Sequence, residues 1–342
     1  MVSTVRAEQT SNNFKSLPPS TSTRLSLADI LLLLCVIIWA FNVPLVKLAL
    51  DYINPLGLSL IRFSSAGLLL FFIARYREKS IAIRMKDLPA VMLCAFLGIA
   101  LNQVFFVYAL KNSTSSEVSL LMASTPTFAT LIAWLTNQET IGWNFWKSLP
   151  VAIAGICLII FTAQTAHFTG GWLGDLLALA TAASWAAYTV IIRPLLKSYS
   201  ISKLTAYITL IGAFMILPFG GEQLNLDVLT KLPGQVWLAV GYSTLASVVL
   251  TNFLWYFGVK QLGGPRTAFY SYLQPFVGVL AAALILNESI VIWQLAGGAL
   301  VIVSMLIYRR KPTRYLEKNK SINQTGQLNN DGNENEIKTG SL

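Results

Sequence analysis

The sequence predicts an all-α integral membrane protein in which ten transmembrane helices form two five-helix repeats of inverted topology. Composition, segment length and an internal repeat support this fold class. Of the 342 residues, 55% are hydrophobic and only 12% are charged, whereas ordinary soluble domains have about 45–50% apolar and about 25% charged residues. The apolar segments are long enough for helices, and they lack the alternation over about ten residues that is typical of barrel strands.

The internal repeat relates residues 106–139 to residues 255–288 without a gap, at one constant offset of 149 residues. Three pairs of residues coincide at this offset: Lys111 with Lys260, Pro126 with Pro275, and Glu139 with Glu288. Each copy has an apolar helix ending in aromatic residues, a short loop after a Lys, an apolar helix with a central Pro, and an acid before the next apolar run. Such a repeat defines the architecture before any single motif is considered.

In chain order, the segments expected to cross the membrane cover residues 28–49, 55–74, 88–110, 117–136, 144–163, 173–192, 204–219, 236–257, 266–286 and 290–308. The first five form the first repeat, residues 27–163, and the last five form the second, residues 172–308. Residues 1–26 are rich in Ser, Thr, Asn and Pro, and residues 309–342 are basic and then rich in Asn, Gln and Gly. Both are expected to be disordered cytoplasmic tails. A cleaved signal peptide is not expected, because the first apolar segment is too long and lacks a cleavage site of small residues.

Orientation follows from the basic residues, which concentrate in the cytoplasmic loops of membrane proteins. With the amino terminus inside, all but four of the 25 Lys and Arg residues lie in inner segments; the exceptions are Lys47, Arg62, Lys111 and Lys231. Both termini are therefore expected in the cytoplasm, and the chain is expected to be a multi-pass protein of the cell membrane. Five helices per repeat is an odd number, so the second repeat enters the bilayer in the opposite direction, a plan typical of secondary transporters.

Charge and rare residue types argue against several classes of function. The topology explains the net charge of +10, so a nucleic-acid partner is not expected. Cys35, Cys94 and Cys157 lie inside apolar segments, where they act as small hydrophobic residues and imply no disulfide framework. His167 is the single histidine, so a metal or catalytic site based on histidine is not expected. An intramembrane enzyme would need a nucleophile with a base, a metal cluster or paired acids, and none occurs at plausible spacing. No catalytic residue, metal or cofactor is expected.

A tryptophan motif occurs in the first helix of each repeat. Trp39-Ala40-Phe41-Asn42 has a counterpart in Trp185-Ala186-Ala187-Tyr188, and a cation follows each motif after five residues, Lys47 or Arg193. Further motifs are the stretch from Pro55 to Arg62-Phe63, the Pro126 and Pro275 helices, and the ends at Glu139 and Glu288. With these motifs in this order, residues 28–308 resemble the ten-helix transporters of the drug/metabolite transporter superfamily that have two EamA domains.

The resemblance implies a polytopic carrier with a central cavity between the repeats, in bacteria mostly an exporter of amino acids or other small metabolites and drugs. Two positions depart from the pattern. Ala40 stands where many members have Gly after the Trp, and the seventh segment has no Arg that matches Arg62. The two halves therefore differ chemically. Pro126 and Pro275 remove a backbone hydrogen bond in mid-helix and predict a kink in each of their segments.

Polar and aromatic side chains inside the apolar segments form the candidate substrate site, because a polar group in a bilayer needs a partner, a water-lined cavity or a functional reason. The candidates are Trp39, Asn42, Arg62, Asn102, Gln103, Phe106, Trp185, Tyr188, Asn252, Tyr256, Tyr270 and Gln274. Amides, hydroxyls and aromatic faces would suit a small molecule with polar and flat apolar parts. The alternative interpretation is that these groups only bond neighbouring helices, or lie at the membrane interface.

Arg62 is the one basic residue well inside an apolar segment. It could bind a substrate carboxylate or phosphate through its planar fork of donors, but an internal pair with backbone carbonyls or with Glu117 is favoured, because the side chain can reach the outer interface. The acids Asp29, Glu117, Glu139, Asp175 and Glu288 all lie at segment ends. A proton relay through a central carboxylate therefore has no obvious residue, which favours facilitated diffusion or substrate exchange.

Glu139-Thr140 and Glu288-Ser289 are interpreted structurally. Thr140 and Ser289 are expected to cap the helices that follow them, with each carboxylate near the positive end of that next helix.

The sequence as a whole predicts a carrier that moves a small metabolite across the membrane by alternating access. Export is the expected direction. Its partners are expected to be the small-molecule substrate and the lipid bilayer. A homodimer remains an alternative to a monomer. Two alternatives remain: an organellar-type exchanger of nucleotide sugars or sugar phosphates, which would call for several cavity cations, and a membrane scaffold without transport.

Overall fold

The computed structural model describes residues 26–78, 80–138, 141–165, 172–262 and 270–309. Throughout these residues the regular secondary structure is helical. Eight helical segments are long and apolar enough to cross a membrane, and two shorter apolar helices cover Gln274–Leu286 and Ile292–Ser304. They match the ten expected segments in order, so the predicted all-α membrane fold is confirmed.

The helices of the first repeat are α1 (Leu27–Leu50), α2 (Pro55–Arg77), η1 (Met85–Asp87), α3 (Leu88–Ala95), η2 (Phe96–Ala100), α4 (Leu101–Asn112), α5 (Ser115–Leu121), η3 (Met122–Ser124), α6 (Thr125–Leu135) and α7 (Trp143–Thr165). Local sequence explains several helix starts. Ser26 caps α1, because its hydroxyl accepts a hydrogen bond from the Asp29 amide. Pro55 occupies the first position of α2, where no backbone N–H is needed.

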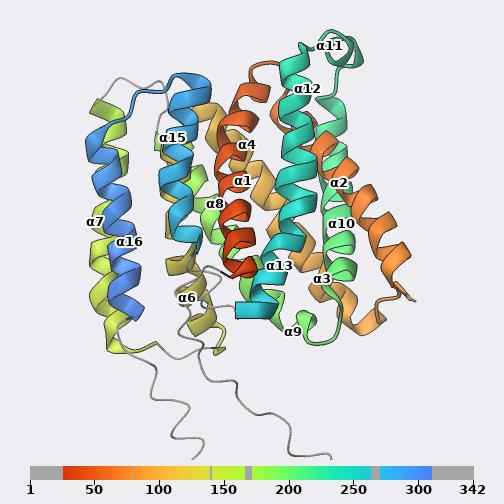
Figure 1. The fold of residues 1–342 in the computed structure, drawn as a ribbon, viewed down its shortest axis with the longest axis horizontal. Coiled ribbons are helices and arrows are strands. Elements are labelled where there is room, and N and C mark those ends of the chain that lie inside the picture. Colours follow the sequence, from red (N-terminus) through yellow and green to blue (C-terminus); the bar gives the residue numbers. More distant parts are fainter. Residues whose placement is uncertain (1–25, 79, 139–140, 166–171, 263–269, 310–342) are drawn as a thin grey trace, which may run out of the picture.

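The helices of the second repeat are α8 (Trp172–Ile191), α9 (Arg193–Leu196), α10 (Ile201–Glu222), α11 (Leu226–Thr230), α12 (Gly234–Gly241), η4 (Tyr242–Leu250), α13 (Thr251–Leu262), η5 (Ser271–Leu273), α15 (Gln274–Leu286) and α16 (Ile292–Arg309). In Figure 1, α1 begins and α16 ends at the lower end of the bundle, here termed the terminal end. The opposite end, which carries α11, is termed the α11 end.

Irregular turns recur at equivalent places in the two repeats. The 3₁₀ turn η3 is displaced from η5 by the same 149 residues that relate the two sequence copies. The π-helical turn η2, shifted by 149 residues, falls inside the π-helical segment η4. The expected interruption at each central proline takes the form of this 3₁₀ turn, and each Pro lies in the first turn of the helix that follows it. The missing N–H of a proline is tolerated at that position.

The two repeats exchange their first helices. α1 packs against α13 and α15 of the second repeat, while α8 packs against α4 and α6 of the first. Equivalent helices also pair directly, α2 with α10 and α7 with α16, and the last pair lies side by side in Figure 1. The repeats therefore form one interlocked bundle.

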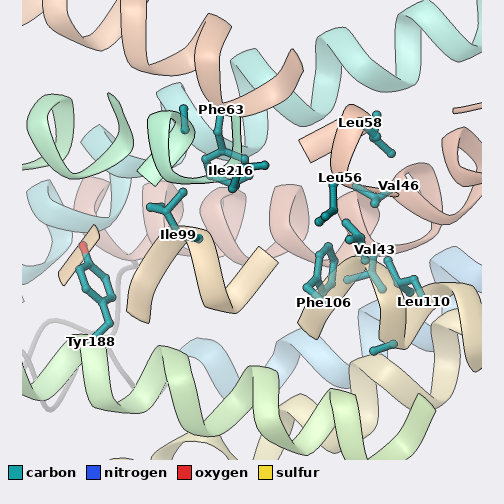
Figure 2. Packing of buried hydrophobic residues seen from close by; sticks show 14 of the residues in the cluster. Val43, Val46, Leu56, Leu58, Phe63, Ile99, Phe106, Leu110, Tyr188 and Ile216 are labelled. Carbon is teal, nitrogen blue, oxygen red and sulfur yellow. The ribbon is translucent and has the colours of Figure 1, made fainter. Parts of the chain in front are cut away.

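The apolar core lies where helices of both repeats meet. It contains buried side chains from α1, α2, α4, α8 and α10, and Figure 2 shows Phe106 within this cluster. Phe106 was expected in the substrate site, but its ring is buried among apolar neighbours.

Candidate functional site

A chain of hydrogen bonds crosses from α2 through α4 to α8. The Arg62 Nη1 group donates to Gln103 Oε1 at 3.4 Å, and Gln103 Nε2 donates to Asn102 Oδ1 at 3.3 Å. Asn102 Nδ2 then donates to the Thr181 carbonyl oxygen at 2.9 Å and to Ser184 Oγ at 3.0 Å. The five side chains are buried. We refer to Arg62, Gln103, Asn102, Thr181 and Ser184 as the polar relay.

The relay unites three of the predicted candidates, but Arg62 has a different partner from those expected. Backbone carbonyls or Glu117 were favoured, and the structure places the Gln103 side chain there instead. The Glu117 carboxylate accepts hydrogen bonds from Ser113, from the Thr114 amide and from Gln294. Glu117 belongs to the capping box at the start of α5, and this local role directs its side chain to the α11 end.

An equivalent contact joins α1 to the second repeat. Trp39 Nε1 donates to the Ser247 carbonyl oxygen at 3.1 Å and to Thr251 Oγ1 at 3.0 Å, and its ring lies 5.1 Å from that of Trp255. Asn42 Oδ1 accepts a hydrogen bond from Ser243. Thr251 is the repeat equivalent of Asn102, so the same position in each repeat bonds the first helix of the other repeat.

The two motif tryptophans have different surroundings. The Trp185 side chain is 37% exposed and forms no hydrogen bond with any described residue, whereas the Trp39 indole is held by α13. The Trp185 ring lies 5.1 Å from the ring of Tyr188. Tyr188 packs so closely on η2 that a Cβ added to Gly98 would lie 2.6 Å from its ring. The small residue at Gly98 therefore leaves the space that the Tyr188 ring occupies.

The remaining candidates do not join either contact. Asn252 Nδ2 donates to the Val248 carbonyl oxygen of η4, one turn earlier in the chain. The Tyr270 hydroxyl donates to the Asp29 carboxylate at the start of α1. Gln274 is half-buried and forms no side-chain hydrogen bond with the described part of the chain. The Tyr256 side chain lies outside what the structure describes.

A charged cluster at the α11 end was not predicted. Lys47 Nζ donates to the carbonyl oxygens of Leu110 and Ser113. Ser113 Oγ lies 2.5 Å from Glu117 Oε2 and 3.1 Å from Asp175 Oδ1. Both carboxylates are buried. The sequence shows each acid at a helix end, but spacing alone cannot show that the ends of α1, α4, α5 and α8 converge.

Glu288 also differs from its predicted role. Its carboxylate accepts from the amides of Ser115 and Ser116, at 2.8 and 3.0 Å, and from Ser116 Oγ at 2.6 Å. It therefore caps α5 of the first repeat and not the helix that follows it. Ser289 does not cap α16 either, because that helix begins at Ile292. Glu139 and Thr140 lie outside the described residues.

Neither of two hollows in the described structure contains a candidate. One, of about 500 Å³, is lined by Phe72, Ile73, Tyr76, Arg77 and Phe253 of α2 and α13. The other, of about 40 Å³, lies at the α11 end beside the α1–α2 turn. Trp39, Asn42 and the members of the polar relay are instead engaged in contacts between closely packed helices.

Comparisons with known proteins agree with the repeat and the fold. The profile of the EamA-like transporter family matches residues 26–161 and 172–310, once for each repeat. The chain is 27% identical over 292 residues to a protein of Streptantibioticus cattleyicolor named a probable terminal-alkyne amino-acid exporter, with 84% of this chain and 95% of that protein covered. It is 25% identical over 287 residues to an uncharacterized transporter of Archaeoglobus fulgidus, with 84% and 98% covered. A solved crystal structure aligns with a TM-score of 0.58 at 19% identity over 82% of this chain and 96% of that one, a likeness of fold alone.

Proposed function

Because the chain belongs to the EamA-like transporter family, we propose that it carries a small metabolite, such as an amino acid or a drug-like compound, out of the cell by alternating access. The similarity to the Streptantibioticus protein, which is named a probable terminal-alkyne amino-acid exporter, supports this substrate class and this direction. The proposed location is the cell membrane with both termini in the cytoplasm, which the distribution of Lys and Arg supports.

The exchange of first helices between the repeats carries the proposal. α1 is bound to the second repeat through Trp39 and Thr251, and α8 is bound to the first repeat through Asn102 and Thr181. These contacts occupy equivalent positions of an inverted repeat. A rocking motion that loosens one contact and tightens the other would open the interior to one side of the membrane at a time.

The driving force proposed is the substrate gradient or exchange of one substrate for another. The acids that the structure describes within the bundle, Asp29, Glu117, Asp175 and Glu288, lie near its two ends. The polar relay between those ends contains amides, hydroxyls and one guanidinium, so it offers no carboxylate for a proton relay.

Counterflow into proteoliposomes tests the proposal. Purified protein would be reconstituted with an unlabelled panel of amino acids and metabolites inside, and uptake of each labelled compound would be measured with and without a pH gradient. We expect one compound class to accumulate, without dependence on the pH gradient. Gln274→Ala is expected to lower that uptake, because Gln274 has an amide that no described residue engages. Gln235→Ala, an exposed glutamine of α12, is the matched control.

Three results would contradict parts of the proposal. Accumulation that depends on the pH gradient would refute the uncoupled mechanism. Uptake restricted to nucleotide sugars or sugar phosphates would favour the exchanger alternative. Failure of every compound to move, in protein whose thermal unfolding shows that it is folded, would favour a membrane scaffold.

A further inference from the structure

The Arg62 guanidinium has hydrogen-bond capacity that the described protein does not use. Its side chain is 2% exposed, yet its one hydrogen bond to a described residue is the long contact of 3.4 Å to Gln103. The Nε group is buried without a partner. Arg62 forms no ion pair with a described acid, and its guanidinium carbon lies 5.3 Å from the centre of the adjacent Phe63 ring. Guanidinium has five N–H donors, and burial of a charge without an opposite charge is unfavourable.

A second unused group lies one helical turn earlier. Ser59 is fully buried at 0% exposure, and its hydroxyl has no partner among the described residues. Residues three apart share a face of a helix, so Ser59 and Arg62 present unused donors to the same side of α2. Both groups are buried, and the Gln103 amide contacts Arg62. A purely structural role for Arg62 explains the bond to Gln103 but not the unused Nε group or the unpartnered Ser59 hydroxyl.

The charge is present in one repeat only. α2 and α10 begin at Pro55 and Ile201, and at this register Ile208 takes the place of Arg62. The interior therefore offers one positive charge with a planar fork of donors. This arrangement complements a single carboxylate, whose two oxygens can accept two parallel hydrogen bonds.

We infer that Arg62 binds the carboxylate of a monocarboxylate substrate, with Ser59 as a further donor. The inference rests on the proposed function and names the chemical class of its substrate. Substrate binding would replace the long Arg62–Gln103 hydrogen bond with a shorter charge-assisted pair. Because Gln103 bonds Asn102, and Asn102 bonds α8, release of Gln103 would loosen the contact between α4 and α8.

The test compares neutral L-amino acids with the corresponding amino-acid amides, which lack the carboxylate, in proteoliposome counterflow. For the wild-type protein we expect uptake of the acids to exceed that of the amides at least tenfold. Arg62→Gln should raise the KM for the acids at least tenfold and abolish the preference over amides, and Arg62→Lys should restore part of it. Arg75→Gln, an exposed arginine of the same helix, is the matched control.

Ser59→Ala keeps the inference testable if Arg62→Gln fails to fold. We expect a rise of a few fold in the KM for the acids, without a change in thermal unfolding. An unchanged KM for the acids in folded Arg62→Gln protein, or equal wild-type uptake of acids and amides, would overturn the inference. Wild-type uptake of uncharged or cationic compounds alone would overturn it and leave the proposed function standing, whereas no transport at all would overturn both.

Discussion

Replacement of Glu288 by glutamine tests whether the second repeat stabilises α5 of the first. The first amides of a helix have no partner within it. In α5, Glu288 accepts from the amides of Ser115 and Ser116, while the hydroxyl of Thr114 accepts from the Glu117 amide. Glu288→Gln keeps one acceptor oxygen, converts the other to a donor, and removes the negative charge from the positive end of the helix.

The expected loss follows from these contacts. A hydrogen bond to a charged group contributes about 1.5–3 kcal/mol, and a carboxylate at a helix N-terminus contributes about 0.3–1 kcal/mol. Because one backbone bond is lost and the other loses its charge, we expect local opening of α5 to become easier by about 2 kcal/mol. This corresponds to roughly 30-fold faster amide exchange.

Hydrogen–deuterium exchange with mass spectrometry measures the effect on a peptide that covers the start of α5. The matched control is Glu222→Gln, which changes an exposed acid at the end of α10 that bonds no described residue. Exchange in α5 that is unchanged in Glu288→Gln, or equally fast in both variants, would refute the capping role.

Two further predictions concern thermal unfolding of the purified protein in detergent. Trp39→Phe should lower stability by about 1–2 kcal/mol, because it removes the indole donor to η4 and α13, whereas Trp185→Phe should change it less, since that indole bonds no described residue. Gly155→Ala should lower stability by about 1–3 kcal/mol, because its Cβ would lie 2.6 Å from the Gly297 carbonyl oxygen where α7 and α16 meet.

The controls for these predictions come from the same fold. Equal shifts for Trp39→Phe and Trp185→Phe would show that the hydrogen bonds of Trp39 do not contribute. Gly241→Ala places a Cβ with nothing within 4 Å, so it should leave stability unchanged or raise it by about 0.5–1 kcal/mol. A loss in Gly241→Ala as large as that in Gly155→Ala would contradict the close approach of α7 and α16.

The residues alone determined the all-helical class, the ten segments and the repeat. A helix satisfies its backbone hydrogen bonds within its own segment, so apolar length is sufficient to identify a membrane span. The same 149-residue offset makes Asn102 and Thr251 equivalent positions, and in the structure both bond the first helix of the other repeat. The second segment also begins at Pro55, as the sequence predicted.

Only the tertiary structure decided which side chains meet. Spacing along a helix shows that residues share a face, but not which helix that face contacts. For this reason Gln103 as the partner of Arg62, α5 as the helix that Glu288 caps, and the grouping of Lys47, Glu117 and Asp175 could not be predicted. Each depends on the packing of the helices, which brings together residues that lie far apart in the chain.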